Sequence, residues 1–407
     1  MKKKSGSIPS LLKLWKNISK FHKFSFLGTC ALSIFAAYLE ALVIFTFIPF
    51  ISNITGTSST QSNLFPSFFK FINLDLKDSN YFVFFTFILM VFLSSASRLI
   101  YIFLTTKTSA RIGSHLSKKL YSLLLNRPYL DHISQDTSYV IQMISSNITR
   151  AVGIISSMGL IVSSSLVCLA ILSSLLLTET RITLMTILFL LISYTFIYKS
   201  SKGGLFNHGN IIRINEEKII RLVKESLNSI REIIINNMYD KYISEYEPID
   251  VELRNNQAKS TFIAQYPRYI IEALMISAIS TIAFILAKNN TVDILPKLAV
   301  FALGFLRVLP AIQQIYLNIA NIKTFSPSLD AINNCLDINS KNIVKTLNKS
   351  DQRRTKYDAV GFNNMPIFQL SNVSFKYPRN KEYALRKVNL KLIKGLKYAI
   401  VGPTGSG

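Results

Sequence analysis

Acidic residues are scarce in this sequence of 407 residues, and charged residues of every kind are few. Asp and Glu number 22 against 46 Lys and Arg, and the four charged types make up only 17% of the chain. Soluble domains carry about 25% charged residues to cover their surfaces. Hydrophobic residues reach 49%, and the mean hydropathy is +0.32. This composition excludes a large soluble core and favours an integral membrane protein.

Cysteine and histidine are also rare, with three and four copies. The cysteines form no CxxC pair, and two of them lie inside apolar stretches, so neither a disulfide framework nor a metal site is indicated. The histidines show no ligand spacing either. We therefore predict no metal site in the residues of this chain, whose cysteines and histidines are Cys30, Cys168, Cys335, His22, His115, His132 and His208.

The low acidic content leaves a net charge of +24. Such a charge is compatible with a nucleic-acid partner. The alternative is the excess of Lys and Arg that membrane proteins place in their cytoplasmic loops. Because the basic residues here gather between apolar stretches, the second explanation is favoured, and no nucleic-acid partner is predicted.

Six apolar segments are long enough to cross a hydrocarbon layer of ~30 Å as helices. They cover roughly residues 24–51, 81–104, 152–177, 182–198, 269–287 and 294–319. We predict a mainly α membrane protein with six transmembrane helices. The organisation predicted is an N-terminal arm (1–23), a six-helix transmembrane domain (24–320), a helical linker (321–365) and a short α/β segment (366–407).

The distribution of basic residues predicts the orientation. The arm holds seven lysines and no small-residue cleavage site, so the first apolar segment is interpreted as an uncleaved span. Segment 105–150 has six basic residues against two acidic ones, whereas loop 52–80 is balanced. Both termini are therefore predicted to be cytoplasmic, in a multi-pass protein of the plasma (inner) membrane. The abundance of Lys, Asn and Ile indicates an AT-rich, bacterial genome.

The predicted cytoplasmic segments, 105–150 and 199–266, are long and amphipathic. Apolar residues recur at helical spacing from Ile219 to Ile230, and Arg221 and Glu225 are placed to form an i,i+4 pair. These segments are predicted to be helices that continue out of the membrane and turn back near residues 127–134 and 236–248.

The pattern of apolar residues changes after Pro366, from helical to strand-like. Val388, Leu390 and Leu392 alternate as in a strand, and Gly395 marks a turn. Residues 398–401 form a short continuous apolar run, which is typical of a strand buried on both faces. A small α/β domain is predicted to begin here.

That run leads directly into Gly402-Pro403-Thr404-Gly405-Ser406-Gly407. A phosphate-binding loop has the pattern G-x-x-x-x-G-K-[ST] between a strand and a helix. Glycines let the backbone wrap closely around phosphate and turn its N–H groups inward. The alternative is a chance turn-like string. The lysine and the Mg²⁺-binding hydroxyl of the pattern would follow Gly407, so we expect the sequence to be a fragment that stops inside the loop.

The order of these features resembles the ATP-binding cassette (ABC) family. Residues 368–378, Phe-Gln-Leu-Ser-Asn-Val-Ser-Phe-Lys-Tyr-Pro, are similar to the opening strand of an ABC domain, and Ala384-Leu385, Gly395 and the loop follow in the family's order. The six spans with long inner loops resemble the exporter branch. This resemblance implies a half-transporter that works as a homodimer, binds ATP with Mg²⁺, and stacks adenine on Tyr377.

The resemblance also implies what this sequence does not contain. The family's catalytic glutamate, signature sequence and switch histidine would lie beyond Gly407, so no catalytic residue is assigned. The full-length protein is expected to be an ATPase and translocase, and this fragment alone is expected to be inactive.

Short matches resemble one group of exporters more closely. Leu39-Glu40-Ala41, Arg127-Pro128-Tyr129, Pro267-Arg268 and Arg307-Val308-Leu309-Pro310 are similar to flippases of lipid-linked oligosaccharides. The implied substrate is a lipid-linked oligosaccharide or another glycolipid, with lipids, drugs or peptides as alternatives. The rival interpretation is a non-hydrolysing membrane protein that binds lipid without pumping.

Ionisable residues within the spans are functional candidates because charges are costly in a bilayer. Arg307, in the predicted sixth span, is a candidate for binding a substrate pyrophosphate through its planar donors. The alternative is a partner carboxylate, for which Glu40 in the first span is the candidate. Arg98 is expected to extend toward the cytoplasmic interface in a structural role.

Overall fold

The computed structural model describes residues 7–55, 80–178, 204–287, 294–354, 366–376, 382–393 and 395–402, with isolated positions between 180 and 195. The chain divides into two compact units, Met1–Asn342 and Ile343–Gly407. This division is coarser than the four segments that the sequence predicts, and its boundary lies inside a continuous helix.

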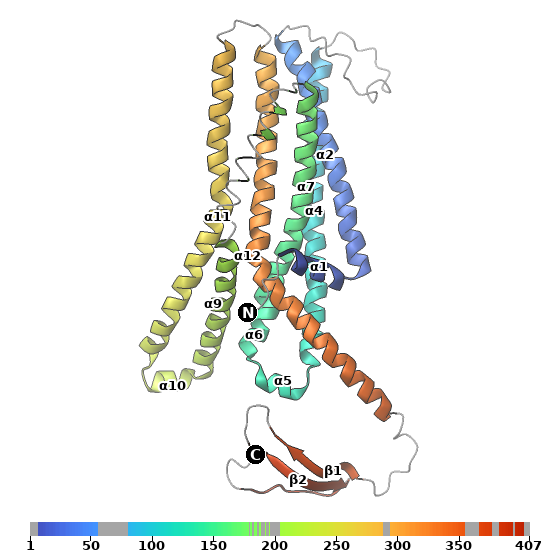
Figure 1. Ribbon diagram of the computed structural model, residues 1–407, viewed down its shortest axis with the longest axis vertical. Coiled ribbons are helices and arrows are strands. Elements are labelled where there is room, and N and C mark those ends of the chain that lie inside the picture. The colour runs from blue at the N-terminus through green and yellow to red at the C-terminus, as the bar shows by residue number, and fades with distance from the viewer. Residues whose placement is uncertain are drawn as a thin grey trace. The chain divides into compact units, whose positions relative to one another are not determined.

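The first unit is helical (Figure 1). A short amphipathic helix precedes long ones, and a π-helical segment, η2, interrupts the third long stretch. The elements are α1 (Ser7–Asn17), α2 (Lys20–Thr55), α4 (Asn80–Leu125), α5 (Tyr129–Ser134), α6 (Thr137–Gln142), η2 (Met143–Asn147), α7 (Ile148–Thr178), α9 (Gly204–Asn228), α10 (Ile230–Ile235), α11 (Tyr239–Ala287) and α12 (Ile294–Arg354).

Three segments of the described helices are long and apolar enough to cross a membrane: Lys20–Phe47, Val83–Leu125 and Thr137–Leu177. They lie on the first three predicted spans. The fourth predicted span, 182–198, falls almost entirely outside the described residues. The fifth and sixth lie within α11 and α12, and their passage through a membrane stays a prediction.

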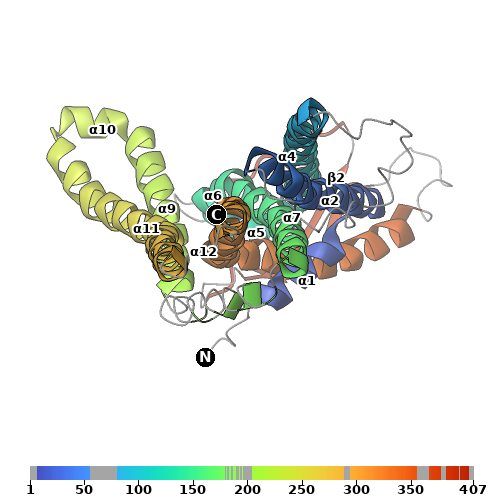
Figure 2. The ribbon, with the colours of Figure 1, turned by 90° about the horizontal axis from the view of Figure 1, so that it is seen from above.

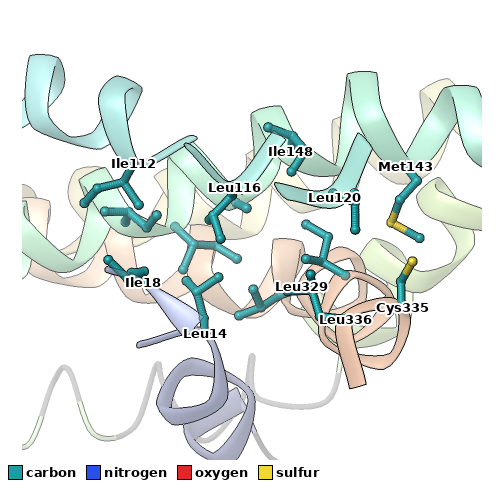
Figure 3. Close-up of a cluster of buried hydrophobic side chains, with 14 of the residues drawn as sticks. Leu14, Ile18, Ile112, Leu116, Leu120, Met143, Ile148, Leu329, Cys335 and Leu336 are labelled. Atoms are coloured by element: carbon teal, nitrogen blue, oxygen red, sulfur yellow. The ribbon is translucent and has the colours of Figure 1, made fainter. Parts of the chain in front are cut away.

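The long helices of the first unit are held together by two apolar clusters. In one, Leu14 of α1 and Ile18, which directly follows α1, pack onto α4, η2, α7 and the distal part of α12 (Figure 3). Leu329 and Leu336 of α12 lie in this cluster with 0% and 4% of their surface exposed. Residues 322–336, predicted to be linker, are therefore part of the packed first unit, because their apolar side chains recur at helical spacing.

The second cluster joins α2, α7, α11 and α12 around Ile44, Ile171, Ile271 and Val308, all of them at most 1% exposed. Gly304 allows α12 to approach α7, since a Cβ at this position would lie 2.8 Å from a methyl carbon of Leu175. Small residues at such contacts permit close packing of helices.

Helices α9 and α11 lie side by side and are joined through α10 (Figures 1 and 2). The predicted reversal at 236–248 lies earlier in the structure: the chain passes from α9 through α10, and only Asn236–Met238 separates α10 from α11. Asn237 has φ 50°, a left-handed conformation that asparagine tolerates, so the chain turns within three residues. Pro248 is accommodated inside α11.

The predicted Arg221–Glu225 pair is not formed. Arg221 instead contacts Asp136 at 2.5 Å and Glu217 at 3.6 Å. The reason is that α6 packs against α9, which brings the carboxylate of Asp136, the N-cap residue of α6, within reach of Arg221. A local i,i+4 pair contributes only ~0.3–0.5 kcal/mol and is easily replaced.

The second unit contains one two-stranded antiparallel sheet, β1 (Pro366–Phe375) and β2 (Leu385–Ile393). The register shifts around Val373, which pairs with Val388, and Asn372 and Lys387 have φ 53° and 47° beside this irregularity. Such positions are typical of β-bulges.

The strand expected at residues 398–401 is not formed. Ile400 and Val401 are 94% and 90% exposed, and the backbone there pairs with neither strand. A strand buried on both faces needs parallel neighbours and covering helices, and the described part of this unit has no strand besides the antiparallel β1 and β2. Gly395, at φ 88°, turns the chain back so that the Ile393 amide donates to the Tyr398 hydroxyl.

Candidate functional site

A cluster of ionised side chains lies between α2, α4 and α12. Glu40 of α2 is 5% exposed and accepts hydrogen bonds from Arg307 Nη1 of α12 at 2.9 Å and from Ser94 Oγ of α4 at 2.8 Å. Arg98 Nη1, also from α4, lies 3.8 Å from the same carboxylate oxygen that Arg307 contacts. Two neighbouring helices and a third from the far end of the helical unit therefore meet at one carboxylate.

Helical periodicity places each of these groups. Ser94 and Arg98 are one turn apart, so both point to the same side of α4. Glu40 lies on the buried face of α2 between Ala37 and Val43, which are 4% and 0% exposed. The carboxylate is thus surrounded by apolar neighbours and reaches polar partners only through α4 and α12.

The charge of this cluster is not balanced. One carboxylate faces two guanidinium groups, and neither arginine has a second carboxylate within 4.0 Å among the residues that the structure describes. A charged side chain at the centre of a membrane helix costs about 2.5–3.5 kcal/mol on insertion scales. An uncompensated positive charge within apolar helices therefore favours the binding of an additional anion.

Arg98 departs from its prediction. It was expected to extend toward the cytoplasmic interface, but its guanidinium joins the Glu40 cluster. Its side chain remains 44% exposed, against 20% for Arg307, so Arg98 is the more accessible of the two cations. Sequence reasoning missed its place because one residue on a helix gives no sign of which neighbour the helix will meet.

Phenylalanine rings from α2 and α4 lie about two to three helical turns from the charge cluster. Phe50 stacks on Phe87 with ring centroids 5.1 Å apart. The ring centroid of Phe47 lies 5.5 Å from that of Phe87, and the centroid of Phe84 lies 6.2 Å from that of Phe50. Such offset and tilted pairs are favourable contacts. The charge cluster and the phenylalanine rings thus both lie where α2 and α4 pack against one another.

A second polar group links α6 and α7 to α9 outside this cluster. Arg150 contacts Glu216 at 3.0 Å, and Gln142 Nε2 donates to the Arg213 carbonyl at 2.5 Å. Asp136 caps α6 by accepting from the Ser138 amide at 2.9 Å. This bond, together with Arg221, lowers the pKa of Asp136 below its ordinary value. The arrangement fixes the two predicted cytoplasmic segments to one another.

The structure places few of the residues expected to bind ATP. Gly402 is exposed and described, whereas Tyr377 and Pro403, Thr404, Gly405, Ser406 and Gly407 lie outside the described residues. Their nucleotide-binding role stays a prediction. Among the residues for which coordinates are described, no group of three or more His, Cys, Asp or Glu side chains is arranged to hold a metal ion.

Comparison with known proteins relates the chain to ABC transporters. Over 301 residues it is 22% identical to the subtilin transport ATP-binding protein SpaT of Bacillus subtilis, a match that covers 68% of this chain and 42% of that protein. Over 43 residues it is 54% and 44% identical to putative ABC transporter ATP-binding proteins of Pyrococcus abyssi and Pyrococcus horikoshii, which covers 11% of this chain and 15% of each relative.

No family model matches the chain. The chain spans less than half the length of each of these relatives. The similarity therefore supports a relationship to ABC transporter proteins, and the apolar helices support a membrane protein.

Proposed function

We propose that this chain is the membrane-spanning part of an ABC exporter that uses ATP to move an anionic amphipathic substrate across the bacterial plasma membrane. The observation that carries this proposal is the match to a transport ATP-binding protein over 68% of the chain, in a chain that also contains apolar, membrane-length helices. ATP, with Mg²⁺, would supply the free energy, and the loop that begins at Gly402 would hold its phosphates.

The charge cluster supports the substrate class. Arg98 and Arg307 present two guanidinium groups to one carboxylate, so the group can pair with a phosphate or pyrophosphate without releasing Glu40. Guanidinium is suited to such anions because its donors form a planar fork. The phenylalanine rings of α2 and α4 would contact the apolar part. A lipid-linked oligosaccharide or another glycolipid fits this combination.

Two copies of the chain are proposed to form the working transporter. Helix α11 exposes large apolar side chains along its length, including Ile243 (61%), Val251 (51%) and Phe262 (68%). Apolar surface of this extent on a helix outside the predicted membrane region indicates a protein contact. Light scattering of the purified protein in detergent tests this point, and a monomeric mass would contradict it.

The transport proposal is tested in proteoliposomes with the transporter that carries its complete nucleotide-binding domain. ATP hydrolysis should be stimulated by a pyrophosphate-linked glycolipid and less by a neutral glycolipid. Replacing Arg98 or Arg307 with Ala should reduce this stimulation. The control is Arg254→Ala, which removes an exposed arginine of α11 that pairs only locally with Asp250.

The two parts of the proposal fail separately. Absence of ATP hydrolysis in the complete protein would overturn the pump and favour a protein that binds lipid without pumping. Hydrolysis that responds equally in the Arg98 and Arg307 variants and in the wild type would leave the pump standing and overturn the anion-pairing role.

A further inference from the structure

A basic cluster lies where α1, α2 and α4 meet, away from the Glu40 group. His22 of α2 faces His115 of α4, and Lys118 and Lys119 follow His115 by about one helical turn. Lys20 and Lys23 flank His22 at the start of α2, where Lys23 Nζ lies 5.9 Å from the centroid of the Trp15 ring of α1. The rings of His22 and His115 lie 5.1 Å apart, and Lys119 Nζ donates to the Asn17 carbonyl in the turn between α1 and α2 at 3.5 Å. These contacts fix cations from two helices in one region.

The cluster carries no compensating carboxylate. None of its four lysines has an Asp or Glu oxygen within 4.0 Å in the part of the chain that the structure describes. The neighbouring acidic residues of α12 have other partners, since Asp330 accepts from Ser10 and Asp337 pairs with Lys13. Lysines without carboxylates attract an external anion.

Exposed apolar side chains adjoin the cluster. Phe21, Phe24 and Leu27 are 74%, 79% and 58% exposed, and Leu12 of α1 is 65% exposed. Another face of α1 is anchored, because Leu14 and the adjoining Ile18 are inserted into the apolar cluster of α4, α7 and α12 (Figure 3). The exposed aromatic side chains are therefore held in place next to the lysines.

The position along the chain indicates what meets this surface. Lys20 is the first residue of the candidate span Lys20–Phe47, and the exposed phenylalanines follow directly. Lysines and aromatic residues at the end of a membrane-spanning helix lie at headgroup depth, where both find favourable partners. A soluble protein partner would have to share this location with the lipid.

We propose that the cluster of Lys20, Lys23, Lys118 and Lys119 binds the headgroup of an anionic phospholipid. The ammonium groups contact the lipid phosphate, and Phe21 and Phe24 enter the adjoining acyl region. Each lysine near a membrane surface that carries anionic lipid strengthens binding several-fold, and the effect weakens within a Debye length. The site fastens α1 and the start of α2 to one leaflet.

The test measures lipid binding to the purified chain in detergent. The probes are dioctanoyl phosphatidylglycerol, dioctanoyl phosphatidylcholine and inorganic phosphate, with binding followed by native mass spectrometry and by the shift in Tm. The wild type should bind the anionic lipid in preference to the zwitterionic one, less tightly at higher salt, and free phosphate should produce no shift.

The variant K20Q/K23Q/K118Q/K119Q should lose affinity for phosphatidylglycerol by roughly tenfold or more. The matched control, K218Q/K224Q/K241Q/K259Q, removes the same number of lysines from α9 and α11 and should bind as the wild type does. Undiminished affinity in the first variant would overturn the site.

Two comparisons on the unaltered protein test the proposal even when the quadruple variant does not fold. Equal affinity for phosphatidylglycerol and phosphatidylcholine would overturn it, as would a Tm shift by inorganic phosphate alone. The single variants K20Q and K118Q, which each remove one charge, should weaken anionic-lipid binding in the same direction.

Discussion

The Arg307 guanidinium donates to the carboxylate of Glu40 at 2.9 Å across 267 positions of sequence. The contact joins α2, the first long helix of the chain, to α12, and it is part-buried. Glu40 also accepts a hydrogen bond from Ser94 and lies near Arg98. The carboxylate is therefore the common partner of the group, whereas each arginine is only one of its two cationic partners.

This asymmetry predicts unequal effects of removing the partners. Glu40→Gln leaves two guanidinium groups with no carboxylate, and we expect it to lower the unfolding free energy by about 3 kcal/mol, as for other broken buried pairs. Arg307→Met leaves Glu40 bonded to Ser94 and close to Arg98, so its loss should be smaller. Unfolding in detergent micelles measures both, with Arg254→Met as an exposed control. Equal losses would contradict the common-partner role.

Gly209 predicts a strong steric effect. A Cβ at this position of α9 would lie 1.9 Å from the Thr324 carbonyl oxygen of α12. Gly209→Ala should therefore force the two helices apart and destabilise the protein by about 1–3 kcal/mol or more. Gly28→Ala is the matched control, because nothing lies within 4 Å of its Cβ. Alanine is the better helix former, so the control should be neutral or stabilising by up to about 1 kcal/mol. The same sign for both variants would refute the clash.

Asp136 predicts a pH dependence. Its pKa is lowered in the folded state, chiefly by the bond from the Ser138 amide and also by Arg221. The stabilisation is present above the ordinary Asp pKa of about 3.9 and is lost as pH falls through the lower folded value. Asp136→Asn keeps a capping side chain but removes the charge. The variant should be less stable than the wild type at neutral pH, and the difference should disappear on acidification. A difference independent of pH would contradict this assignment.

The buried hydrogen bond of Tyr101 predicts a small loss of stability when its hydroxyl is removed. Tyr101 is 1% exposed, and its hydroxyl donates to the Gly159 carbonyl of α7 at 2.6 Å. Tyr101→Phe keeps the ring and removes the bond, so the unfolding free energy should fall by about 1 kcal/mol. Tyr121→Phe, at a side chain that is 53% exposed, should change it little. An unchanged stability for both would show that the bond contributes nothing.

Periodicity made the helices of the first unit predictable. The apolar stretches predicted α2, α4 and α7 because membrane-length runs admit few other structures. The helical spacing of apolar residues in segments 105–150 and 199–266 also predicted that helices continue beyond the spans. The turn at 236–248 was misplaced, since the left-handed conformation of Asn237 leaves only a weak trace in sequence and Pro248 indicated a break that α11 does not have.

The site was only partly predictable for a different reason. Arg307 and Glu40 were candidates because ionised residues in apolar runs are conspicuous, and the structure brings them together. Their function toward a substrate stays a prediction. The contacts of Arg98 and Ser94 with Glu40, and those among the phenylalanine rings of α2 and α4, depend on which helices pack together. Periodicity does not encode that choice. The run at 398–401 failed as a strand because burial there depends on neighbours that the two-stranded sheet does not provide.

Two prolines lie within α12 at Pro310 and Pro327, and each leaves the carbonyl four residues earlier without its usual amide partner. A side-chain contact lies close to each proline. Arg307 reaches Glu40 one turn before Pro310, and Ser328, directly after Pro327, accepts from Arg150 at 3.3 Å, while the Ser326 hydroxyl donates to the Lys323 carbonyl that Pro327 leaves open. Side-chain contacts thus support α12 at both points where its own backbone lacks a hydrogen bond, and the contact beside Pro310 involves the arginine that is proposed to meet the substrate anion.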